Sequence, residues 1–593
     1  MNLKSVSGKE WIIKKFKEEE VNFLKENFFL DDIISKLLVL RKIKKEDVNT
    51  YLNPSIKNSM PNPFILKDMD KAVKRTVNSI VKNKKIGIFG DYDVDGATST
   101  AILGNFFKEI KIDYHIYIPD RKNEGYGPSI KGFKNLISKG VDLIFTVDCG
   151  TLSFKPVEFA KNSKIDVLVL DHHQSDISLP DAYSIVNPNR IDDNSKLNYL
   201  CAAGVCFMFL VALNSELRKQ KWFTKNNIQE PNLITFLDLV SLGTICDVVP
   251  LIGLNRALVK QGLKIVDNRS NLGLKTISDL CKIESKLTTY HLGYIIGPRI
   301  NAGGRVGKCS HGANLLLNSS AKKSFKLASE LELYNKERQE LEKEILKKSN
   351  ILISDKINDP IIILSGENWH EGVIGIIAAR IKDKYNKPTI IISTKNNVGK
   401  ASARSVVGFD IGRVIITGVQ KGILKKGGGH KMAGGFTILT DQINEFKSFI
   451  FKEYKKLNVN MEKEKKIYID SIISPSALNI NFYNKINTLA PFGSGNPEPK
   501  FSIENLKSLK SKIVGEKHIK SILLASDGTT VKTIAFNSVD SNLGPYLLKK
   551  NNPINIAGKL SLNEWKGEKN VEFIIDDISV NKEIKKMVPS SIG

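Results

Sequence analysis

Short apolar runs alternate with amphipathic helical segments between residues 61 and 320. The runs include "IGIF", "VDLIFTV" and "IDVLVL", and a typical helical segment between runs reads "KDMDKAVKRTVNSIVK". Runs of this length without polar alternation are typical of strands that are buried on both faces. Because strands that alternate with helices form parallel sheets, this region predicts a doubly wound parallel α/β domain.

Ligand-type side chains follow three of these apolar runs directly, and a further aspartate follows a helical stretch in "LGTICDVVPL". In an open parallel sheet the carboxyl ends of the strands meet at one edge, where ligands bind. A single aspartate after a strand is usually a turn or helix-cap residue, but a succession of three such strand ends indicates a site. The residues concerned are, in chain order, Asp91, Asp93, Asp95, Asp148, Asp171, His172, His173 and Asp247.

Carboxylates packed this closely would repel one another and take up protons unless cations neutralised them. Oxygen ligands with one or two imidazoles suit Mn²⁺ or Mg²⁺, whereas zinc and copper sites contain more His and Cys. Two such ions roughly 3.5 to 4 Å apart can activate water and stabilise both the attacking and the leaving oxygen of a phosphoryl group. The pattern therefore predicts a hydrolytic site with two divalent cations, Mn²⁺ or Mg²⁺. Asp91 lies outside the Asp93/Asp95 pair and is expected to orient a ligand.

The rest of the chain predicts further domains on both sides of this one. A connector rich in Pro and Asn, "NPSIKNSMPNPF", places a boundary near residue 60, and a segment without Gly or Pro predicts one long connecting helix. Strand and helix patterns then return, and after "APFGSGNPEP" only short strands and turns follow, as in a small β-barrel. The expected domains are an N-terminal helical segment (1–60), the parallel-sheet domain (61–320), the connecting helix (321–352), a second α/β domain (353–455) and a β-barrel domain (456–593).

The formal net charge of +26 over 593 residues favours a nucleic acid as partner, because a phosphate backbone attracts a basic surface. A coding bias toward Lys, Asn and Ile would also explain this charge. Neither a secretory signal nor an apolar stretch of bilayer length occurs, so we expect a cytoplasmic protein without membrane contact. The six cysteines form no C-x-x-C pair and predict reduced thiols.

Longer motifs carry a resemblance to a known family. "DYDVDG", "VDCG", "LDHH" and "CDVVP" resemble, in order and spacing, the four motifs of the DHH phosphoesterases. "GPRINAGGRVG", "WHEGVIGIIAARI", "ASARSV", "GGGHKMAGGF" and "APFGSGNPEP" are similar to motifs of the RecJ exonucleases within that family. The resemblance implies a DHH domain, a DHH-associated domain and an OB-fold. It also implies exonuclease activity on single-stranded DNA from 5′ to 3′, with release of 5′ mononucleotides, during DNA recombination and repair.

The resemblance also assigns roles to the acidic cluster. It implies that Asp148 bridges the two ions and that His173 contacts the scissile phosphate or supports the site. Asp171 is expected to orient His172. Many members carry a histidine where this chain has Phe89, so we expect no ligand there. The implied metal ligands, which with His173 form the catalytic set, are Asp93, Asp95, Asp148, His172 and Asp247.

A second set of residues is expected to hold the DNA. The glycines of "KKGGGHKMAGG" allow backbone amides to approach a phosphate, and arginine's planar fork matches phosphate geometry. By resemblance, Ser402 and Arg404, together with Arg305 and Arg121, hold the terminal 5′ phosphate, although each arginine alone is equally typical of a surface salt bridge. The full expected set is Arg121, Arg299, Asn301, Arg305, Ser402, Arg404, Gly428, Gly429 and His430.

Two other functions fit parts of the sequence. Smaller DHH enzymes cleave short oligonucleotides or cyclic dinucleotides, but the long basic chain with its barrel-like domain disfavours that substrate class. A catalytically inactive scaffold that binds single-stranded DNA is the other alternative, and the intact set of acidic ligands disfavours it because buried carboxylates are costly to keep. Partners expected beside the DNA are a single-strand-binding protein and a helicase.

Overall fold

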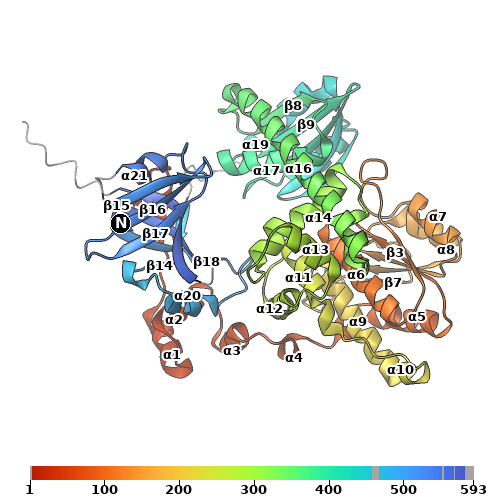
Figure 1. Ribbon diagram of the computed structural model, residues 1–593. Helices are drawn as coiled ribbons and strands as arrows, with labels where there is room; N and C mark the ends of the chain where they lie inside the picture. The colour runs from red at the N-terminus through yellow and green to blue at the C-terminus, as the bar shows by residue number, and fades with distance from the viewer. Residues whose placement is uncertain (1–2, 457–465, 550–552, 566–567, 581–593) are drawn as a thin grey trace, which may run out of the picture. The chain divides into compact units, whose positions relative to one another are not determined.

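The computed structural model describes residues 3–456, 466–549, 553–565 and 568–580, and its chain divides into two compact units (Figure 1). One unit combines residues 1–61, 248–261 and 462–593, and the other combines residues 62–247 and 262–461. No helix within the described ranges is both long enough and apolar enough to cross a lipid bilayer. Four parts of the expected barrel domain lie outside the described residues, namely 457–465, 550–552, 566–567 and 581–593.

The second unit begins with a five-stranded parallel sheet in the order β4-β3-β5-β6-β7, which confirms the doubly wound α/β class (Figure 1). Its strands are β3 (Ile86–Gly90), β4 (Tyr114–Tyr117), β5 (Leu143–Val147), β6 (Asp166–Leu170) and β7 (Ser184–Val186). The helices around it are α5 (Met69–Val81), α6 (Val94–Glu109), α7 (Ile130–Ser138), α8 (Phe154–Asn162) and α9 (Ala202–Lys219).

Both faces of this sheet are covered, which explains why its strands read as continuous apolar runs. On one face Phe145 of β5 packs against Phe107 of α6 and Phe209 of α9, with ring centroids 5.9 and 5.4 Å apart. On the other face Ile144 belongs to a buried cluster with Phe133 of α7 and other side chains of α7 and α8. All five residues of β3 and of β5 are buried.

Helices follow the sheet and lead into the second α/β part. They are α10 (Trp222–Lys225), α11 (Leu237–Cys246), α12 (Gly253–Asp267), α13 (Leu272–Leu280), a π-helix (His291–Ile296), α14 (Gly297–Val306) and α15 (His311–Leu317). The expected long connecting segment is helix α16 (Ala321–Ile353), which has 33 residues. Because α16 packs against α13, α14, α15 and α17, it is a packed element of this unit over most of its length.

The second α/β part contains a mixed sheet in the order β11-β12-β10-β9-β8, in which only β8 and β9 are parallel. Its strands are β8 (Ile362–Glu367), β9 (Thr389–Lys395), β10 (Val398–Arg404), β11 (Lys426–His430) and β12 (Ala433–Leu439). Its helices are α17 (Glu371–Tyr385), α18 (Ile411–Gln420) and α19 (Ile443–Lys456).

The first unit contains a six-stranded sheet in which five strands, β15, β16, β17, β19 and β18, close into a barrel through a pairing between β15 and β18, while β14 pairs with β15 alone. Its strands are β14 (Ser471–Ile472), β15 (Phe501–Val514), β16 (His518–Leu524), β17 (Thr530–Ala535), β18 (Ile554–Trp565) and β19 (Glu568–Ser579). A small sheet of β1 (Leu3–Lys4), β2 (Glu10–Ile13) and β13 (Lys466–Ile469) joins the N-terminal segment to the barrel side of the chain. The shorter helices of this unit are α1 (Glu18–Phe28), α2 (Asp32–Leu40), α3 (Val48–Leu52), α4 (Ile56–Ser59), α20 (Ile480–Asn487) and α21 (Gly544–Leu548).

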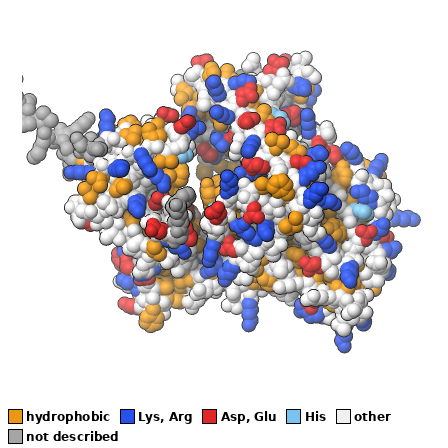
Figure 2. Space-filling model, viewed as in Figure 1, with side chains coloured by type: hydrophobic (Ala, Val, Ile, Leu, Met, Phe, Trp, Pro, Cys, Tyr) orange, Lys and Arg blue, Asp and Glu red, His pale blue; other side chains and the backbone are white. Residues whose placement is uncertain are grey.

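The N-terminal segment shares one hydrophobic core with the barrel. Leu37 and Leu38 of α2 and Val48 of α3 are fully buried in the same cluster as Phe501 and Ile503 of β15. The helical segment expected at residues 1–60 therefore also contains two strands and packs as part of the barrel unit. Figure 2 shows Lys and Arg side chains spread over the visible surface, with Asp and Glu side chains between them.

Arg256 of α12 is the largest fully buried side chain among the described residues and links three segments of the first unit. Its guanidinium lies over the ring of Tyr51 at 4.0 Å and donates to the Tyr51 carbonyl oxygen at 2.8 Å. It also donates to the carbonyl oxygens of Leu489 and Ala490, each at 2.9 Å. Burial lowers the pKa of Arg256 to about 10, so the group stays charged at neutral pH.

We expect Arg256→Met to destabilise this unit by about 3 kcal/mol, since several buried carbonyl oxygens would lose their donors. Urea unfolding of the full-length chain, followed by the fluorescence of Trp11 in the same unit, measures the change. Lys264→Ala, at an exposed position on the same helix, is the control and should change the stability by less than about 0.5 kcal/mol. Equal unfolding midpoints for both variants would contradict this role of Arg256.

Candidate active site

The parallel sheet brings the expected acidic residues to one edge. Gly90 of β3 is aligned with Val147 of β5, and Val147 is aligned with Leu170 of β6. The next residues along the three strands are therefore side by side, and they are Asp91, Asp148 and Asp171. Asp247 joins them from the C-terminal end of α11.

His172 lies at the centre of this cluster. Its Nε2 is 3.3 Å from an oxygen of Asp148, 3.5 Å from one of Asp247 and 3.7 Å from one of Asp95. The same nitrogen is buried without a hydrogen-bond partner among the described residues. An unpartnered buried nitrogen that faces three carboxylates fits a metal ligand, because burial without any partner is otherwise unfavourable.

A second group of possible ligand atoms consists of Asp91, Asp93 and Asp148, whose oxygens lie within 4.8 Å of one another. Asp148 belongs to this group and to a group with His172 and His173. A carboxylate shared by two groups fits the position between two ions. Because the donors are mostly carboxylate oxygens with one or two imidazoles, the site suits Mn²⁺ or Mg²⁺.

Asp91 and Asp95 differ in their hydrogen bonds. Both oxygens of Asp95 accept backbone N–H groups at the start of α9, from Ala202 at 2.6 Å and from Ala203 at 3.0 Å. One oxygen of Asp91 is instead buried without a hydrogen-bond partner among the described residues. Asp95 also forms, with His172 and Asp247, a group of possible ligand atoms within 4.8 Å of one another. The contacts therefore fit Asp95 as a ligand that backbone donors hold in place, and they add Asp91 as a further candidate ligand.

The pKa values of the cluster report the same crowding. Burial, reinforced by the neighbouring carboxylates, raises the pKa of Asp91, Asp95 and Asp148 above the usual range. Burial and the charge of Asp95 raise the pKa of Asp247 to about 8. Burial lowers the pKa of His172, so its imidazole is neutral, as a metal ligand must be. Without cations the carboxylates would hold protons.

Asp171 holds the histidine pair in place. One of its oxygens accepts the His173 ring N–H at 2.7 Å, and the other accepts the Thr151 hydroxyl at 2.6 Å. Burial alone would lower the pKa of His173, but the bond to Asp171 outweighs it and raises the pKa to about 9. The ring that Asp171 orients is therefore that of His173, whereas His172 donates only its backbone N–H to Asp171.

Tyr126 is a site residue that the sequence analysis missed. Its hydroxyl donates to the carbonyl oxygen of Asp148 at 3.1 Å and is 3.1 Å from the His173 ring. Asp148 has a φ of 59°, so this bond holds a strained backbone position. Tyr126 lies five residues after Arg121, in the segment "NEGYG". Phe89, as expected, is no ligand, because it is fully buried and stacks on Tyr117.

Three of the expected arginines lie in a second cluster with Ser402. Arg404 donates to the Ser402 hydroxyl at 3.2 Å, and Arg305 donates to the Gly372 carbonyl oxygen at 3.1 Å. Burial and then the nearby charge of Arg121 lower the pKa of Arg305, to about 10, and also that of Arg404. Within the described residues none of these three arginines pairs with a carboxylate, so the cluster is suited to bind an anion.

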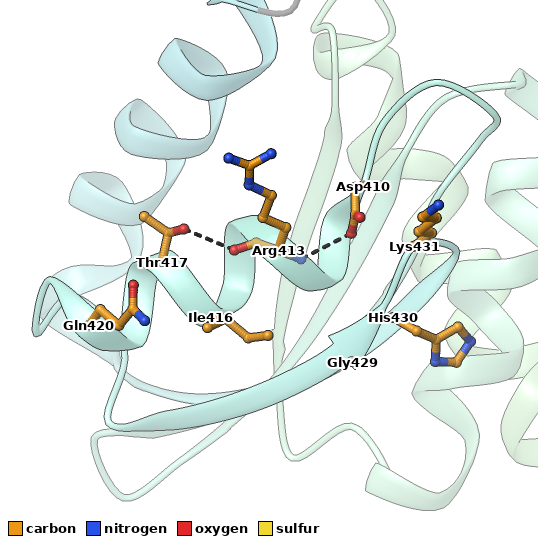
Figure 3. A pocket seen from close by; sticks show the side chains of 8 residues that line it. All are labelled: Asp410, Arg413, Ile416, Thr417, Gln420, Gly429, His430 and Lys431. Carbon is orange, nitrogen blue, oxygen red and sulfur yellow. Dashed lines mark hydrogen bonds between the residues drawn. The ribbon is translucent and has the colours of Figure 1, made fainter. Parts of the chain in front are cut away.

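The other expected DNA contacts lie elsewhere in the same unit. Arg299 pairs with Glu332 of α16 at 2.5 Å, so its charge is already compensated. Asn301 is half-buried on α14. Gly429 and His430, at the end of the exposed edge strand β11, line a pocket of about 530 Å³ that also includes Arg413 and Lys431 (Figure 3). Gly428 precedes them on the same strand.

Three family descriptions match the chain in succession. Residues 85–244 match the N-terminal domain of the DHH family, residues 358–456 match the DHHA1 domain and residues 469–577 match the RecJ OB domain. The single-stranded-DNA-specific exonuclease RecJ of Escherichia coli (strain K12) is 33% identical over 542 residues, which cover 89% of this chain and 92% of that protein. The protein of the same name from Haemophilus influenzae is 34% identical, and the match covers 88% of this chain and 92% of that protein.

Two solved structures are similar along much of their length. RecJ from Thermus thermophilus in complex with Mn²⁺ has a TM-score of 0.78 and 25% identity, and the match covers 96% of this chain and 80% of that chain. A structure described as exonuclease RecJ bound to manganese has a TM-score of 0.56 and 30% identity, and the match covers 66% of this chain and 95% of that chain. Both relatives are thus described as manganese complexes.

We expect the metal-free protein to lose stability as the pH rises from 5 to 8. The folded protein binds protons more tightly than the unfolded chain at every carboxyl whose folded pKa exceeds the unfolded value of about 4. Between the unfolded and the folded pKa of each such carboxyl, the free energy of unfolding therefore falls by up to about 1.4 kcal/mol per pH unit as the pH rises. Adding Mn²⁺ at about 100 times its Kd should restore about 2.7 kcal/mol. Thermal unfolding in EDTA and in Mn²⁺ across this range tests both statements. An unfolding temperature in EDTA that is independent of pH would contradict the assignment.

Proposed function

The chain belongs to the RecJ family, and we propose that it is a metal-dependent exonuclease that degrades single-stranded DNA from the 5′ end and releases 5′ mononucleotides. The observation that carries this proposal is the buried cluster of carboxylates around His172, which lies in the same unit as a cluster of unpaired arginines. Its expected place is in DNA recombination and repair.

We assign the metal ligands from the contacts of this chain. Asp91, Asp93 and Asp148 would hold one ion, and Asp95, His172 and Asp247 would hold the other together with the shared Asp148. When bound, two divalent ions supply activation of the attacking water and charge compensation for the leaving 3′ oxygen. Relative to the sequence expectation, Asp91 is added to the ligand set, and the N–H groups at the start of α9 orient Asp95.

His173 supplies a positive charge in this mechanism. With a pKa of about 9 its ring carries both protons at neutral pH, and the Nδ1 proton points to Asp171. The side chain is 45% exposed, unlike that of His172 at 12%, so a phosphate can reach it. We therefore assign His173 to the scissile phosphate, where a cation offsets the charge that develops on the phosphoryl oxygens.

The arginine cluster is the proposed holder of the terminal 5′ phosphate. Arg121, Arg305 and Arg404 have no carboxylate partner among the described residues, and the Ser402 hydroxyl lies beside Arg404. Guanidinium forks bind phosphate in a bidentate manner, and two of these three are mostly buried, where such bonds are stronger. This grip would set the 5′ to 3′ polarity, because only a chain end can occupy it. Arg299 is left out, since Glu332 compensates its charge.

Two further surfaces are proposed to contact the rest of the strand. The exposed strand β11, with Gly428, Gly429 and His430, offers backbone amides and an imidazole. The barrel strand β15 presents the exposed Lys507 and Lys510, and an OB-fold groove binds single strands through such basic residues. We further propose a single-strand-binding protein and a helicase as partners and the cytoplasm as location, since the substrate is single-stranded DNA in the process of repair.

The two alternatives from the sequence analysis are less well supported. A phosphodiesterase for short oligonucleotides or cyclic dinucleotides would have no use for a barrel of the RecJ OB type. An inactive scaffold would not need Asp91 and His172 to be buried with atoms that lack hydrogen-bond partners.

Asp148→Asn is expected to abolish hydrolysis and to keep DNA affinity within a few-fold of wild type, because the basic surface is untouched. Hydrolysis of 3′-labelled single-stranded DNA in Mn²⁺ and binding of the same DNA in EDTA measure the two effects. Asp181→Asn, an exposed surface change at a residue that pairs with Lys161, is the control and should behave as wild type. Full activity of Asp148→Asn would refute the metal centre.

Arg404→Gln is expected to reduce selectively the turnover of DNA with a 5′ phosphate. Loss of one charge-assisted bidentate contact should lower kcat/KM by roughly 10- to 100-fold on this substrate, with a much smaller effect on DNA with a 5′ hydroxyl. Arg218→Gln removes an exposed arginine that pairs with Glu230 and is the charge-matched control. If Arg404→Gln affected both substrates equally, the cluster would not be the 5′ phosphate site.

A further inference from the structure

Two exposed tyrosines form a stacked pair in the second unit. Tyr290 is 60% exposed and Tyr294 is 75% exposed, and their ring centroids are 5.4 Å apart with an interplanar angle of 26°. Leu292 and Ile296, on the opposite side of the same helical turns, are fully buried. An apolar ring pair that faces solvent while its neighbours form the core is available to a ligand with flat rings.

The pair lies on a π-helix that packs beside the metal-ligand cluster. The Leu292 carbonyl oxygen accepts from the Cys246 thiol at 3.5 Å. A Cβ at Gly293 would be 3.2 Å from Ile245, and a Cβ at Gly297 would be 2.4 Å from the Cys246 sulfur, so glycine permits this close approach. Cys246 directly precedes Asp247 in the chain. Short π-helical segments occur frequently at functional sites.

One continuous helical segment connects the tyrosine pair to the arginine cluster. The π-helix (His291–Ile296) runs directly into α14 (Gly297–Val306), which carries Arg305 near its end. Arg305 follows Tyr294 by eleven positions, which span about 16 Å at 1.5 Å per residue. A stacked strand advances about 3.4 Å per nucleotide, so this distance corresponds to at most about five nucleotides.

We propose that Tyr290 and Tyr294 form a base-stacking platform for the single-stranded substrate on the 3′ side of the cleavage site, within about five nucleotides of the 5′ end. The inference rests on the proposed exonuclease function and adds to it a contact to bases, where the arginine cluster contacts phosphate. Stacking on aromatic rings accepts every base, because every base has a π-face, and therefore suits an enzyme that must pass along any sequence.

The double variant Tyr290→Ala/Tyr294→Ala tests the platform with the full-length protein in Mn²⁺. The affinity for 5′-phosphorylated dT₂₀ in EDTA should fall by roughly 5- to 100-fold, and the KM for hydrolysis of this DNA should rise by a similar factor. This is the effect of losing one stacked base. Turnover of a 5′-phosphorylated dinucleotide should stay at the wild-type rate, because that substrate is too short to reach the pair. Tyr290→Phe/Tyr294→Phe should restore wild-type behaviour, since stacking needs the ring and not the hydroxyl.

The matched control is Tyr183→Ala, a half-exposed tyrosine that directly precedes β7 and so lies at the opposite edge of the parallel sheet. Equal binding of dT₂₀ by the double alanine variant and the wild type would overturn the platform. A loss of dinucleotide turnover as large as the loss on dT₂₀ would also overturn it, because such a loss indicates a structural role. Wild-type protein that hydrolyses neither substrate would instead refute the exonuclease function, so the two failures are distinguishable.

A scan with single abasic sites in dT₂₀ locates the contact. In wild type, removal of the stacked base, at one of positions 3 to 5 from the 5′ end, should weaken binding about as much as the double alanine change does. In the double alanine variant the same abasic sites should have no further effect, because the stacking partner is already absent. Additive losses would show that the base and the tyrosines act independently, and would overturn the proposal.

Discussion

Repulsion among buried carboxylates at one edge of the parallel sheet is the constraint on which the site depends. The sheet register aligns Asp91, Asp148 and Asp171 at this edge, and Asp247 adds a further charge from α11. The charge of these carboxyl groups is compensated in different ways. Asp171 is saturated by hydrogen bonds from Thr151 and the histidine pair, which lowers its pKa despite burial. Asp91, Asp148 and Asp247 have raised pKa values instead, because burial and the neighbouring carboxylates disfavour their charged forms. The chain thus separates a carboxylate that positions a histidine from carboxylates that need cations.

Asp95 combines a contact within the fold with a place in the acidic cluster beside His172. It lies in the first turn of α6 and accepts two N–H groups at the start of α9, where the helix dipole favours a negative charge. The three aspartates of "DYDVD" therefore make different contacts. Asp91 leaves the strand toward the open edge, Asp93 caps α6 through the Gly96 N–H, and Asp95 turns back into the helical layer. Sequence spacing cannot distinguish these directions, because the chain changes from strand to helix within the motif.

Much of the fold and the location of the site were predictable, because apolar runs that end in ligand residues are a local signal. The parallel sheet, the long helix α16 and the barrel follow from periodicity alone, and the acidic cluster follows from the rule that strand ends share an edge. Contacts between distant segments were not predictable in this way. Tyr126 reaches the Asp148 carbonyl across 22 residues, Asp171 orients His173 rather than His172, and Arg299 finds Glu332 on another helix. Such partners are set by tertiary packing, which leaves no pattern in the local sequence.

The motif "APFGSGNPEP" shows how one such tertiary arrangement bears on the site. The Leu251 N–H donates to the Ser494 carbonyl oxygen at 2.8 Å, and Arg256 donates to carbonyl oxygens within the motif, so residues 248–261 belong to the barrel unit. Asn496, 1% exposed, donates to the Leu489 carbonyl oxygen at 2.9 Å and so holds the turn that receives Arg256. Asp247 is the last residue before this segment and is bound to it covalently. The chain therefore passes from one unit to the other directly after Asp247, at the end of α11. A motif far along the chain, with no chemically reactive side chain, thus decides to which unit the residues after Asp247 belong.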